Sequence, residues 1–413
     1  MNLKSRLLLL VMVFACSLAN AQTYDLLIKG GRLIDPKNSI DGIMDIAIKD
    51  GKVAKVAKSI SGSDAVKMIN AEGLLVTPGL IDMHGHVFHG TQPNHYLSDG
   101  LIAVPPDGFT FRVGVTTIVD CGGPGWKNFD TFKKNIIEPS KTRVLAFMNI
   151  VGEGMRGGPW EQNTGDMDAK LSAMVARQNR QYVVGFKVAH YSNRDWIPID
   201  RAVEAGRIAE IPVIVDFGGS NAFEPLSIRE LFFNRLRPGD IYTHTYAELN
   251  GARETVVDRE TREFQPFVLE AQKRGIIFDV GYGGASFEFK QAIPALAAGL
   301  YPNTISTDLH TGSMNAAMKD MLNVMTTFMA MGMELPDVIE ASTWKPAQVI
   351  QRTELGHLSE GAIADLSILN IRDGDFTLWD RTGQKVPSDH KLECEVTLKD
   401  GKVMYDLNGR SIQ

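Results

Sequence analysis

Eight short apolar runs recur between residues 75 and 308, and longer stretches of helical character separate them. Near-continuous hydrophobicity is typical of parallel strands that are buried on both faces. Regular alternation of such strands with helices indicates βα units, and eight units over this length predict an α/β fold of the (β/α)8 TIM-barrel type. An open, doubly wound sheet is the alternative, but no GxGxxG turn follows the first run. The runs are residues 75–83, 116–120, 144–150, 183–188, 212–217, 241–244, 276–280 and 304–308.

Both ends of the chain have a different texture, with short alternating strands and tight turns. Residues 24–29 and 45–48 are strand-like, as are residues 365–369 and 396–398 near the C-terminus. Asp-Gly pairs at 50–51 and 400–401 are typical hairpin turns. A chain of 413 residues exceeds the roughly 250–300 residues that one core usually serves. We therefore expect a small β-sandwich built from residues 22–75 and 346–413, beside a barrel of residues 76–345.

The first 21 residues resemble a secretory signal peptide. Lys4 and Arg6 precede an apolar stretch at 7–18, and an Ala-Asn-Ala sequence at 19–21 suits signal peptidase. The stretch is too short to span about 30 Å of bilayer as a helix. We expect cleavage and a periplasmic or secreted protein that keeps no membrane attachment. The alternative is an uncleaved anchor or a lipid on Cys16.

Composition excludes some classes of function. The net charge is −6 and no long basic run occurs, so a nucleic-acid partner is not expected. Cys121 and Cys394 are too few for a disulfide framework, even in an exported protein. The sequence therefore favours a core-stabilised protein that acts on a small molecule.

Polar side chains stand at the ends of four of the eight runs. The first run ends in His84-Gly85-His86, and two histidines at i and i+2 on a strand point the same way. Lys187 lies in the fourth run, His244 ends the sixth, and Asp308 ends the eighth. In a barrel these ends converge on one mouth. Imidazole and carboxylate groups are ligands for zinc and related divalent metals, so the set predicts a metal site.

These motifs resemble the amidohydrolase superfamily. The resemblance rests on residues 76–86, on Lys187, His244 and Asp308, and on residues 356–366, which look like the return of the chain into a β-sandwich. A narrower resemblance is to the amidohydrolase/deacetylase branch, which includes enzymes similar to N-acyl-D-amino-acid deacetylases and acetyl-mandelate esterases. The segments that carry it are residues 114–120, 137–140, 143–147, 239–244 and 306–310.

The resemblance implies a ligand set. One metal takes His84, His86 and Asp308, and a CO2-derived carbamate on Lys187 bridges it to a second metal. The second metal also takes histidines that end strands five and six. His244 fits the sixth strand, but Asp216 stands where the family has the fifth-strand histidine.

Two readings of Asp216 remain open. It either ligates the second metal, or pairs with an unmodified Lys187 and leaves a single-metal site. Zinc is the expected ion, one or two per chain. Manganese or iron is the alternative, because a further anionic ligand favours harder metals.

The chemistry expected of such a site is hydrolysis by metal-activated hydroxide. Asp308 would accept the proton of the attacking water and pass it to the leaving group. Tyr282 either donates to the oxyanion or is an ordinary packed tyrosine. His190 and His310 are candidates for substrate contact, and Arg156 is a candidate for binding a substrate carboxylate.

We therefore expect a deacetylase-like hydrolase of an amide or ester bond in a small acyl compound. A cyclic-amide hydrolase similar to dihydroorotase or hydantoinase shares the same metal logic. A binding protein that has lost turnover through Asp216 is the third reading. Related enzymes are often symmetric assemblies, so a homo-oligomer is possible.

Overall fold

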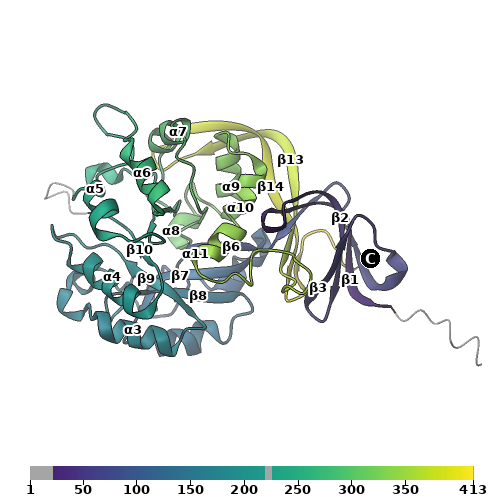
Figure 1. Ribbon diagram of the computed structural model, residues 1–413, viewed down its shortest axis with the longest axis horizontal. Helices are drawn as coiled ribbons and strands as arrows, with labels where there is room; N and C mark the ends of the chain where they lie inside the picture. Colours follow the sequence, from purple (N-terminus) through teal and green to yellow (C-terminus); the bar gives the residue numbers. More distant parts are fainter. Residues whose placement is uncertain (1–21, 219–225, 413) are drawn as a thin grey trace, which may run out of the picture.

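The computed structural model describes residues 22–218 and 226–412, which build two β-sheets and the helices around one of them (Figure 1). The helix-covered parallel sheet forms the larger body, and the second sheet lies beside it. The predicted signal segment, residues 1–21, lies outside the described residues. No helix within the described ranges is long and apolar enough to cross a membrane.

The parallel sheet follows chain order, with each strand beside its predecessor. Its strands correspond to the first seven apolar runs, and β7, β8, β9 and β10 are buried along their length apart from the first residue of β8. Burial on both faces explains why these runs carry so few polar residues. The strands are β6 (Leu80–Gly85), β7 (Val115–Gly125), β8 (Arg143–Asn149), β9 (Val183–Val188), β10 (Val213–Val215), β11 (Ile241–Tyr242) and β12 (Ile277–Phe278).

The eighth run, residues 304–308, is not a continuous strand, yet it touches both edges of this sheet. Thr304 forms an isolated parallel bridge with Asp279, and Leu309 forms one with Gly85. The Val280 N–H donates to the Thr304 carbonyl at 3.0 Å. On the other side, the Asp308 N–H donates to the carbonyl of His84 at 2.6 Å. The segment thus links the β12 edge to the β6 edge.

α-Helices separate the parallel strands from β7 onward and also follow β12, and several begin or end at residues suited to those places. The Asp168 carboxylate caps α3 by accepting from two backbone N–H groups, and Asp320 caps α9. Gly275, at φ 104°, ends α6 in the left-handed conformation that glycine adopts most easily. The helices are α2 (Phe129–Phe132), α3 (Ala169–Gln178), α4 (Ile197–Ala209), α5 (Ile228–Glu230), α6 (Phe267–Arg274), α7 (Phe289–Ala297), α8 (Thr311–Met314), α9 (Met321–Ala330), α10 (Leu335–Glu340) and α11 (Trp344–Val349).

Two layers of apolar side chains hold this body together. One layer lies between the strands and the surrounding helices. The other fills the inner side of the sheet and continues to α11, whose Ala347 lies under the first residues of the strands together with Ile350. The inner layer comes from alternate positions of successive strands, including Ile81, Val119, Leu145, Val184, Ile214 and Ile241. The floor of the functional site is therefore closed by packing.

The second sheet combines strands from both ends of the chain, as predicted. Its order is β15-β14-β13-β5-β1-β2-β3, and β4 pairs with β1. The predicted Asp-Gly turns at 50–51 and 400–401 have positive φ at both residues, as type I′ hairpin turns require. The strands are β1 (Tyr24–Asp35), β2 (Ile40–Lys49), β3 (Lys52–Ala57), β4 (Ala65–Asn70), β5 (Leu75–Pro78), β13 (Leu366–Trp379), β14 (Lys385–Lys399) and β15 (Lys402–Asp406).

Both expected boundaries between the two parts cut through an element. The run at 75–83 divides into β5, which pairs with β1 and β13, and β6, the first parallel strand. Gly79 lies between them, where a Cβ atom would stand 2.3 Å from Thr116 Oγ1. The chain changes sheets at this close approach, one short strand after the expected boundary at 75/76. The boundary at 345/346 falls inside α11.

The hairpin of β13 and β14 belongs to the terminal sheet but extends far beyond the other strands of that sheet. In Figure 1 it arches from the terminal sheet across the top of the larger body to α7. Its tip is anchored there: the Phe289 N–H donates to Asp380 Oδ2 at 2.8 Å, and Arg381 pairs with the buried Glu288 at 2.5 Å. The hairpin therefore supports the segment that follows β12.

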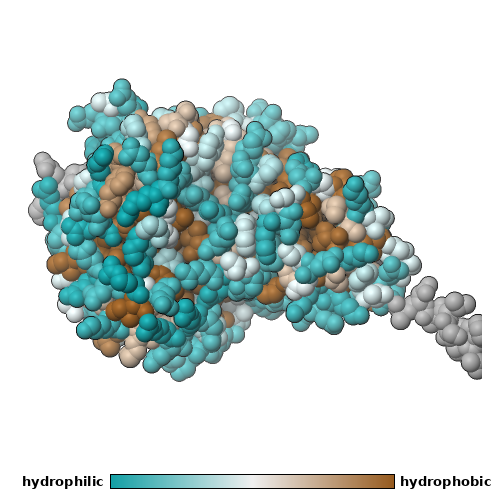
Figure 2. Space-filling model, in the orientation of Figure 1, coloured by the Kyte–Doolittle hydropathy of each residue, from teal (hydrophilic) through white to brown (hydrophobic). Residues whose placement is uncertain are grey.

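The face of the molecule seen in Figure 2 is largely hydrophilic. Its hydrophobic residues form separate patches over both bodies, bordered by hydrophilic ones. This face presents no single broad apolar surface.

Candidate functional site

A cavity of about 420 Å³ opens at the carboxyl ends of the parallel strands. All six residues predicted as metal ligands line it, although they come from five different segments of the chain. Two further predicted residues, His190 and His310, line it as well. The six are His84, His86, Lys187, Asp216, His244 and Asp308.

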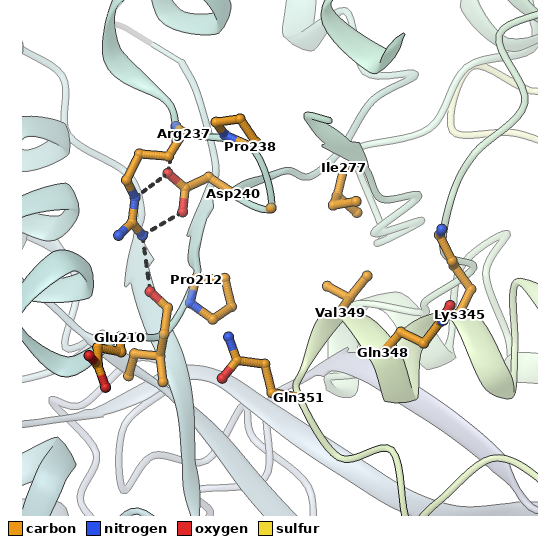
Figure 3. A pocket seen from close by; sticks show the side chains of 12 residues that line it. Glu210, Pro212, Arg237, Pro238, Asp240, Ile277, Lys345, Gln348, Val349 and Gln351 are labelled. Carbon is orange, nitrogen blue, oxygen red and sulfur yellow. Dashed lines mark hydrogen bonds and ion pairs between the residues drawn. The ribbon is translucent and has the colours of Figure 1, made fainter. Parts of the chain in front are cut away.

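A second cavity, of about 510 Å³, lies at the opposite ends of the strands beside α11 (Figure 3). Its Arg237 guanidinium is held by the Asp240 carboxylate and the Ile211 carbonyl, so both charges are satisfied within the wall. The rest of the lining mixes apolar side chains, such as Ile277 and Val349, with polar ones, such as Lys345. The chemistry-bearing side chains gather in the first cavity.

His84, His86 and Asp308 form a compact cluster in which one ligand atom of each residue lies within 4.8 Å of the others. His86 Nε2–H donates to Asp308 Oδ1 at 2.8 Å, and His84 Nε2 lies 3.6 Å from the same oxygen. Burial lowers the pKa of both histidines, so they are neutral near pH 7. Two imidazoles and a carboxylate that converge in this way fit a divalent metal ion.

Asp308 is ionised although it is buried. Burial opposes the charge, but the hydrogen bond from His86 and the nearby His310 bring the pKa of Asp308 to about 2. The backbone N–H of Gly312 donates to His310 Nδ1, so His310 Nε2 carries the proton, 4.0 Å from Asp308 Oδ2. One oxygen of Asp308 therefore faces the histidine pair, and the other faces His310.

His244 and Asp216 form a second group on the other side of the cavity. His244 Nδ1–H donates to the Gly281 carbonyl at 2.5 Å, and its Nε2 lies 3.5 Å from Asp216 Oδ2. The other oxygen of Asp216 lies 3.9 Å from the guanidinium of Arg253, which is fully buried. Burial opposes the charge of Asp216, but the nearby His244, Lys187 and His190 hold its pKa well below its usual value.

Lys187 reaches the cavity from β9 and is 1% exposed. Its Nζ lies 3.4 Å from His84 Nε2 and contacts the thiol of Cys121. Within the described residues Lys187 makes no ion pair with Asp216, so the pairing that the single-metal reading requires is not formed. Cys121 and Cys394 are both buried free thiols, and burial raises the pKa of each.

Three residues of the site hold an unusual backbone conformation. His190, His244 and Asp308 have φ of 55°, 54° and 56°. Non-glycine residues adopt the left-handed region rarely, and such positions gather at functional sites. Each of these three follows a parallel strand or the bridged segment that closes the sheet, and the backbone turns its side chain into the cavity.

His190 connects this cavity with an outer one of about 800 Å³. His190 Nδ1–H donates to the buried Glu161 at 2.8 Å, and Tyr96 lines both cavities. Arg156 lies in the outer cavity, with its guanidinium 3.9 Å from the centre of the Trp160 ring. The structure therefore places His190 and His310 beside the cluster of His84, His86 and Asp308, and it places Arg156 further out.

Tyr282, unlike the predicted histidines, does not line the cavity of the ligand cluster. Its hydroxyl donates to the Trp379 carbonyl in the C-terminal hairpin, and its ring stacks on Phe287 at 4.1 Å. Of the two readings of Tyr282, this geometry fits the ordinary packed tyrosine. The flanking glycines face the site instead: a Cβ atom on Gly283 would lie 2.5 Å from Asp308 Oδ2.

Known proteins of similar sequence identify the family. A deacetylase of Brucella anthropi is 32% identical over 83% of each chain, and a deacetylase of Agrobacterium fabrum is 32% identical over 81% of this chain and 80% of its own. The sequence profile of the amidohydrolase family matches residues 287–404. This chain belongs to the amidohydrolase family.

Solved structures agree with this assignment. The fold of this amidohydrolase is similar to that of an adenine deaminase, with a TM-score of 0.81 and 28% identity over 93% of this chain and all of the other. A dihydroorotase gives a TM-score of 0.80 and 29% identity over 92% and 99%. The ligand cluster lies at the same end of the sheet as the sequence motifs predicted.

Four residues of the amidohydrolase site were not predicted. Thr243 and Asp279 lie behind His84. Glu161 contacts His190, and Arg253 lies close to Asp216. Thr243 and Asp279 interrupt apolar runs, which is a signal that could have drawn attention to them. Glu161 lies in a short 3-10 helix and Arg253 in a loop, and neither carries such a signal.

Proposed function

We propose that this amidohydrolase is a metal-dependent deacetylase, which hydrolyses an amide or ester bond and releases an acetyl or similar acyl group from a small molecule. One observation carries the proposal: the buried cluster of His84, His86 and Asp308, with ligand atoms within 4.8 Å. Its context is a chain that is 32% identical to a deacetylase over 83% of its length.

Zinc is the proposed ion, with manganese or iron as alternatives. His84, His86 and Asp308 would hold one ion, and a carbamate formed from CO2 on Lys187 would join it to a second ion held by Asp216 and His244. The 3.4 Å approach of Lys187 Nζ to His84 Nε2 supports this arrangement, as does the 3.5 Å approach of Asp216 to His244. A metal bound here would polarise a carbonyl oxygen and make a bound water acidic.

Asp308 is the proposed proton carrier. Its Oδ2 faces the cavity and His310, while Oδ1 is held by His86. A carboxylate with a pKa of about 2 is a weak base in isolation, so it must accept the proton from a water that has been made acidic. Asp308 would then return that proton to the departing nitrogen or oxygen.

The part of the substrate beyond the acyl group would occupy the outer cavity. His190 and His310 line the inner cavity, and His190 lines the outer one as well. His190 Nδ1–H donates to Glu161, and His310 Nε2 lies 4.0 Å from Asp308 Oδ2. Arg156 offers a guanidinium that is stacked on Trp160 and suited to a carboxylate. The proposed substrates are therefore acyl derivatives of small acids.

The fold is proposed to be a (β/α)8 barrel with a terminal β-sandwich. The bridges of Thr304 and Leu309 to the two sheet edges support residues 304–308 as the eighth strand. The terminal sheet has its own apolar core, which supports a separate β-rich unit from residues 22–75 and 346–413. Residues 76–345 would form the barrel, although residues 76–78 pair with strands of the terminal sheet.

A cyclic-amide hydrolase is the second candidate, and one observation favours it. The dihydroorotase structure aligns with 92% of this chain at a TM-score of 0.80. The dihydroorotase sequences that match cover much less, for example 37% of this chain at 41% identity. A binding protein without turnover is the third candidate, and it would leave the buried ligand cluster without a purpose.

The experiment is a substrate panel on the purified protein, with elemental analysis of the same sample. Acetyl esters and N-acetyl derivatives of hydroxy and amino acids should be hydrolysed, and dihydroorotate and hydantoins should not. Two metals per chain would support the binuclear site. One metal, rising to two in Asp216→His, would support a single-metal site. Hydrolysis of rings alone would overturn the deacetylase proposal.

Export and partners complete the proposal. Residues 1–21 would be removed as a signal peptide, so the mature protein would be periplasmic or secreted, without membrane attachment. Its partner would be a small-molecule substrate and not a nucleic acid, and it would form a homo-oligomer. N-terminal sequencing of the protein recovered from a cell fraction and light scattering test these points. An N-terminus at residue 1 in the cytoplasmic fraction would contradict export.

A further inference from the structure

Asp279, just beyond β12, is a fully buried carboxylate behind the cluster of His84, His86 and Asp308. Asp279 has no exposed surface, and hydroxyl groups from three residues surround it. Thr304 Oγ1 donates to Oδ1 at 2.6 Å, and Ser306 Oγ lies 2.8 Å from both oxygens. Thr243 Oγ1 donates to Oδ2 at 2.7 Å. Both oxygens of Asp279 therefore act as acceptors.

Thr243 connects the Asp279 carboxylate to the His84 ring by hydrogen bonds. A threonine hydroxyl has one proton, and that proton is given to Asp279. The oxygen of Thr243 must therefore accept from its other neighbour, His84 Nδ1, at 2.9 Å. His84 Nδ1 then carries the ring proton, and Nε2 keeps its lone pair, 3.6 Å from Asp308 Oδ1.

The reverse arrangement would need a proton on Asp279. It would also put the ring proton on His84 Nε2, which lies 3.4 Å from Lys187 Nζ. A lysine ammonium has donors and no acceptor, so it matches an Nε2 that keeps its lone pair. The contacts on both sides of the ring therefore favour the tautomer of His84 with the proton on Nδ1.

We infer that Thr243 and Asp279 are positioning residues that fix the tautomer and the ring orientation of His84 for metal binding. The inference rests on the proposed metal-dependent function. Neither residue touches the proposed metal or substrate; both act through the His84 ring. His244 has a carbonyl in the equivalent place, from Gly281. His84 differs from His244 because its Nδ1 is linked through the Thr243 hydroxyl to the Asp279 carboxylate.

Close packing holds the hydrogen-bonded series of Asp279, Thr243 and His84 in place. A Cβ atom on Gly281 would lie 2.4 Å from Thr243 Oγ1 and 3.0 Å from His84 Nδ1. Groups that orient a metal-binding histidine also increase its basicity, and their loss commonly lowers metal affinity about 10–100-fold.

The test replaces Thr243 by valine, which keeps the shape and removes the hydroxyl, and by serine, which restores it. Metal-free protein is titrated with Zn2+ alone, in competition with a chromophoric chelator, and the melting temperature is recorded beside the affinity. We expect Thr243→Val to bind Zn2+ about 10–100-fold more weakly than wild type. Thr243→Ser should recover most of that loss, and Asp279→Asn should act in the same direction as Thr243→Val.

A second readout is independent of metal and of turnover. Histidine-ring 15N shifts of metal-free protein, with His84 assigned from the signal lost in His84→Gln, report which nitrogen is protonated. Protonated Nδ1 in the wild type and a mixture in Thr243→Val are expected. Protonated Nε2 in the wild type would overturn the inference, and so would a Thr243→Val variant of lower melting temperature but unchanged Zn2+ affinity. Zn2+ binding without deacetylation would overturn the proposed function alone.

Discussion

Gly281→Ala is the most demanding test of the site geometry, because a single methyl group would enter the space between two ligand histidines. The new Cβ would lie 2.4 Å from Thr243 Oγ1, 2.8 Å from His244 Nδ1 and 3.0 Å from His84 Nδ1. Ordinary contacts begin near 3.4 Å, so the nearest neighbour must move by about 1 Å. Gly281 also has φ of 48°, a region that alanine occupies at a cost of about 1–2 kcal/mol.

Together with overpacking, which typically costs about 1–3 kcal/mol, the expected loss of unfolding free energy is about 2–5 kcal/mol. A displacement of about 1 Å in a catalytic group commonly lowers activity about 100-fold. We therefore expect kcat/KM to fall about 100-fold and bound metal to fall as well.

The matched control is Gly284→Ala in the same segment. Gly284 also borders the cavity, but its Cβ would meet neighbours at 3.4 Å and its φ is not positive. Urea unfolding, elemental analysis and initial rates are measured on both variants. If Gly281→Ala were as stable, as metal-loaded and as active as Gly284→Ala, the described positions of His84 and His244 would be refuted.

Four further predictions concern Asp308, the metal and Arg156. Asp308→Asn should lower kcat/KM about 10²–10⁴-fold while circular dichroism is unchanged, and full activity would rule out the proton transfer. In metal-free protein, Asp308 has a pKa of about 2 against about 3.9 when unfolded, so its ionisation stabilises the fold above pH 4 by about 2–3 kcal/mol. That contribution should disappear between pH 4 and 2, and urea unfolding of wild type and Asp308→Asn should converge there; a constant difference would contradict the low pKa. Chelation should cost about 2.7 kcal/mol relative to protein with free metal at 100 times Kd, and an unchanged melting curve would argue against a bound metal. Arg156→Met should raise KM about 10-fold or more for carboxylate-bearing substrates but not for their neutral amides, and equal effects on both would exclude a carboxylate contact.

The strands of the parallel sheet were predictable because burial on both faces leaves a plain apolar signature. Residues 183–188 were placed to the residue, and β7 and β8 were found within a few residues. The division of residues 75–83 was not predictable, since an apolar run does not show that the chain passes from one sheet to another at Gly79. The eighth run forms isolated bridges instead of a continuous strand, because Asp308 leaves the extended conformation at φ 56°.

The site could be predicted where a polar residue ends an apolar run, as with His84, His86, His244 and Asp308. The two readings of Tyr282 stayed open because β12 is only two residues long, Ile277–Phe278, and so short a strand does not fix which side each later residue faces. Gly281 and Gly283 occupy the inward positions instead. Hydroxyl groups in strands are common, so the roles of Thr243 and Ser306 could be recognised only when the structure brought them to Asp279.

The reach of the β13–β14 hairpin has a consequence for synthesis on the ribosome. The parallel strands and their helices are all synthesised before residue 350. The segment after β12, however, is anchored by residues 379–381. The sheet that contains β1 and β5 is likewise incomplete until β13 has been synthesised. Contacts of such long sequence separation form late. A nascent chain therefore carries all of its proposed metal ligands some seventy residues before their supports exist. Premature termination anywhere in that interval should release a chain with a complete set of proposed ligands and an unsupported site.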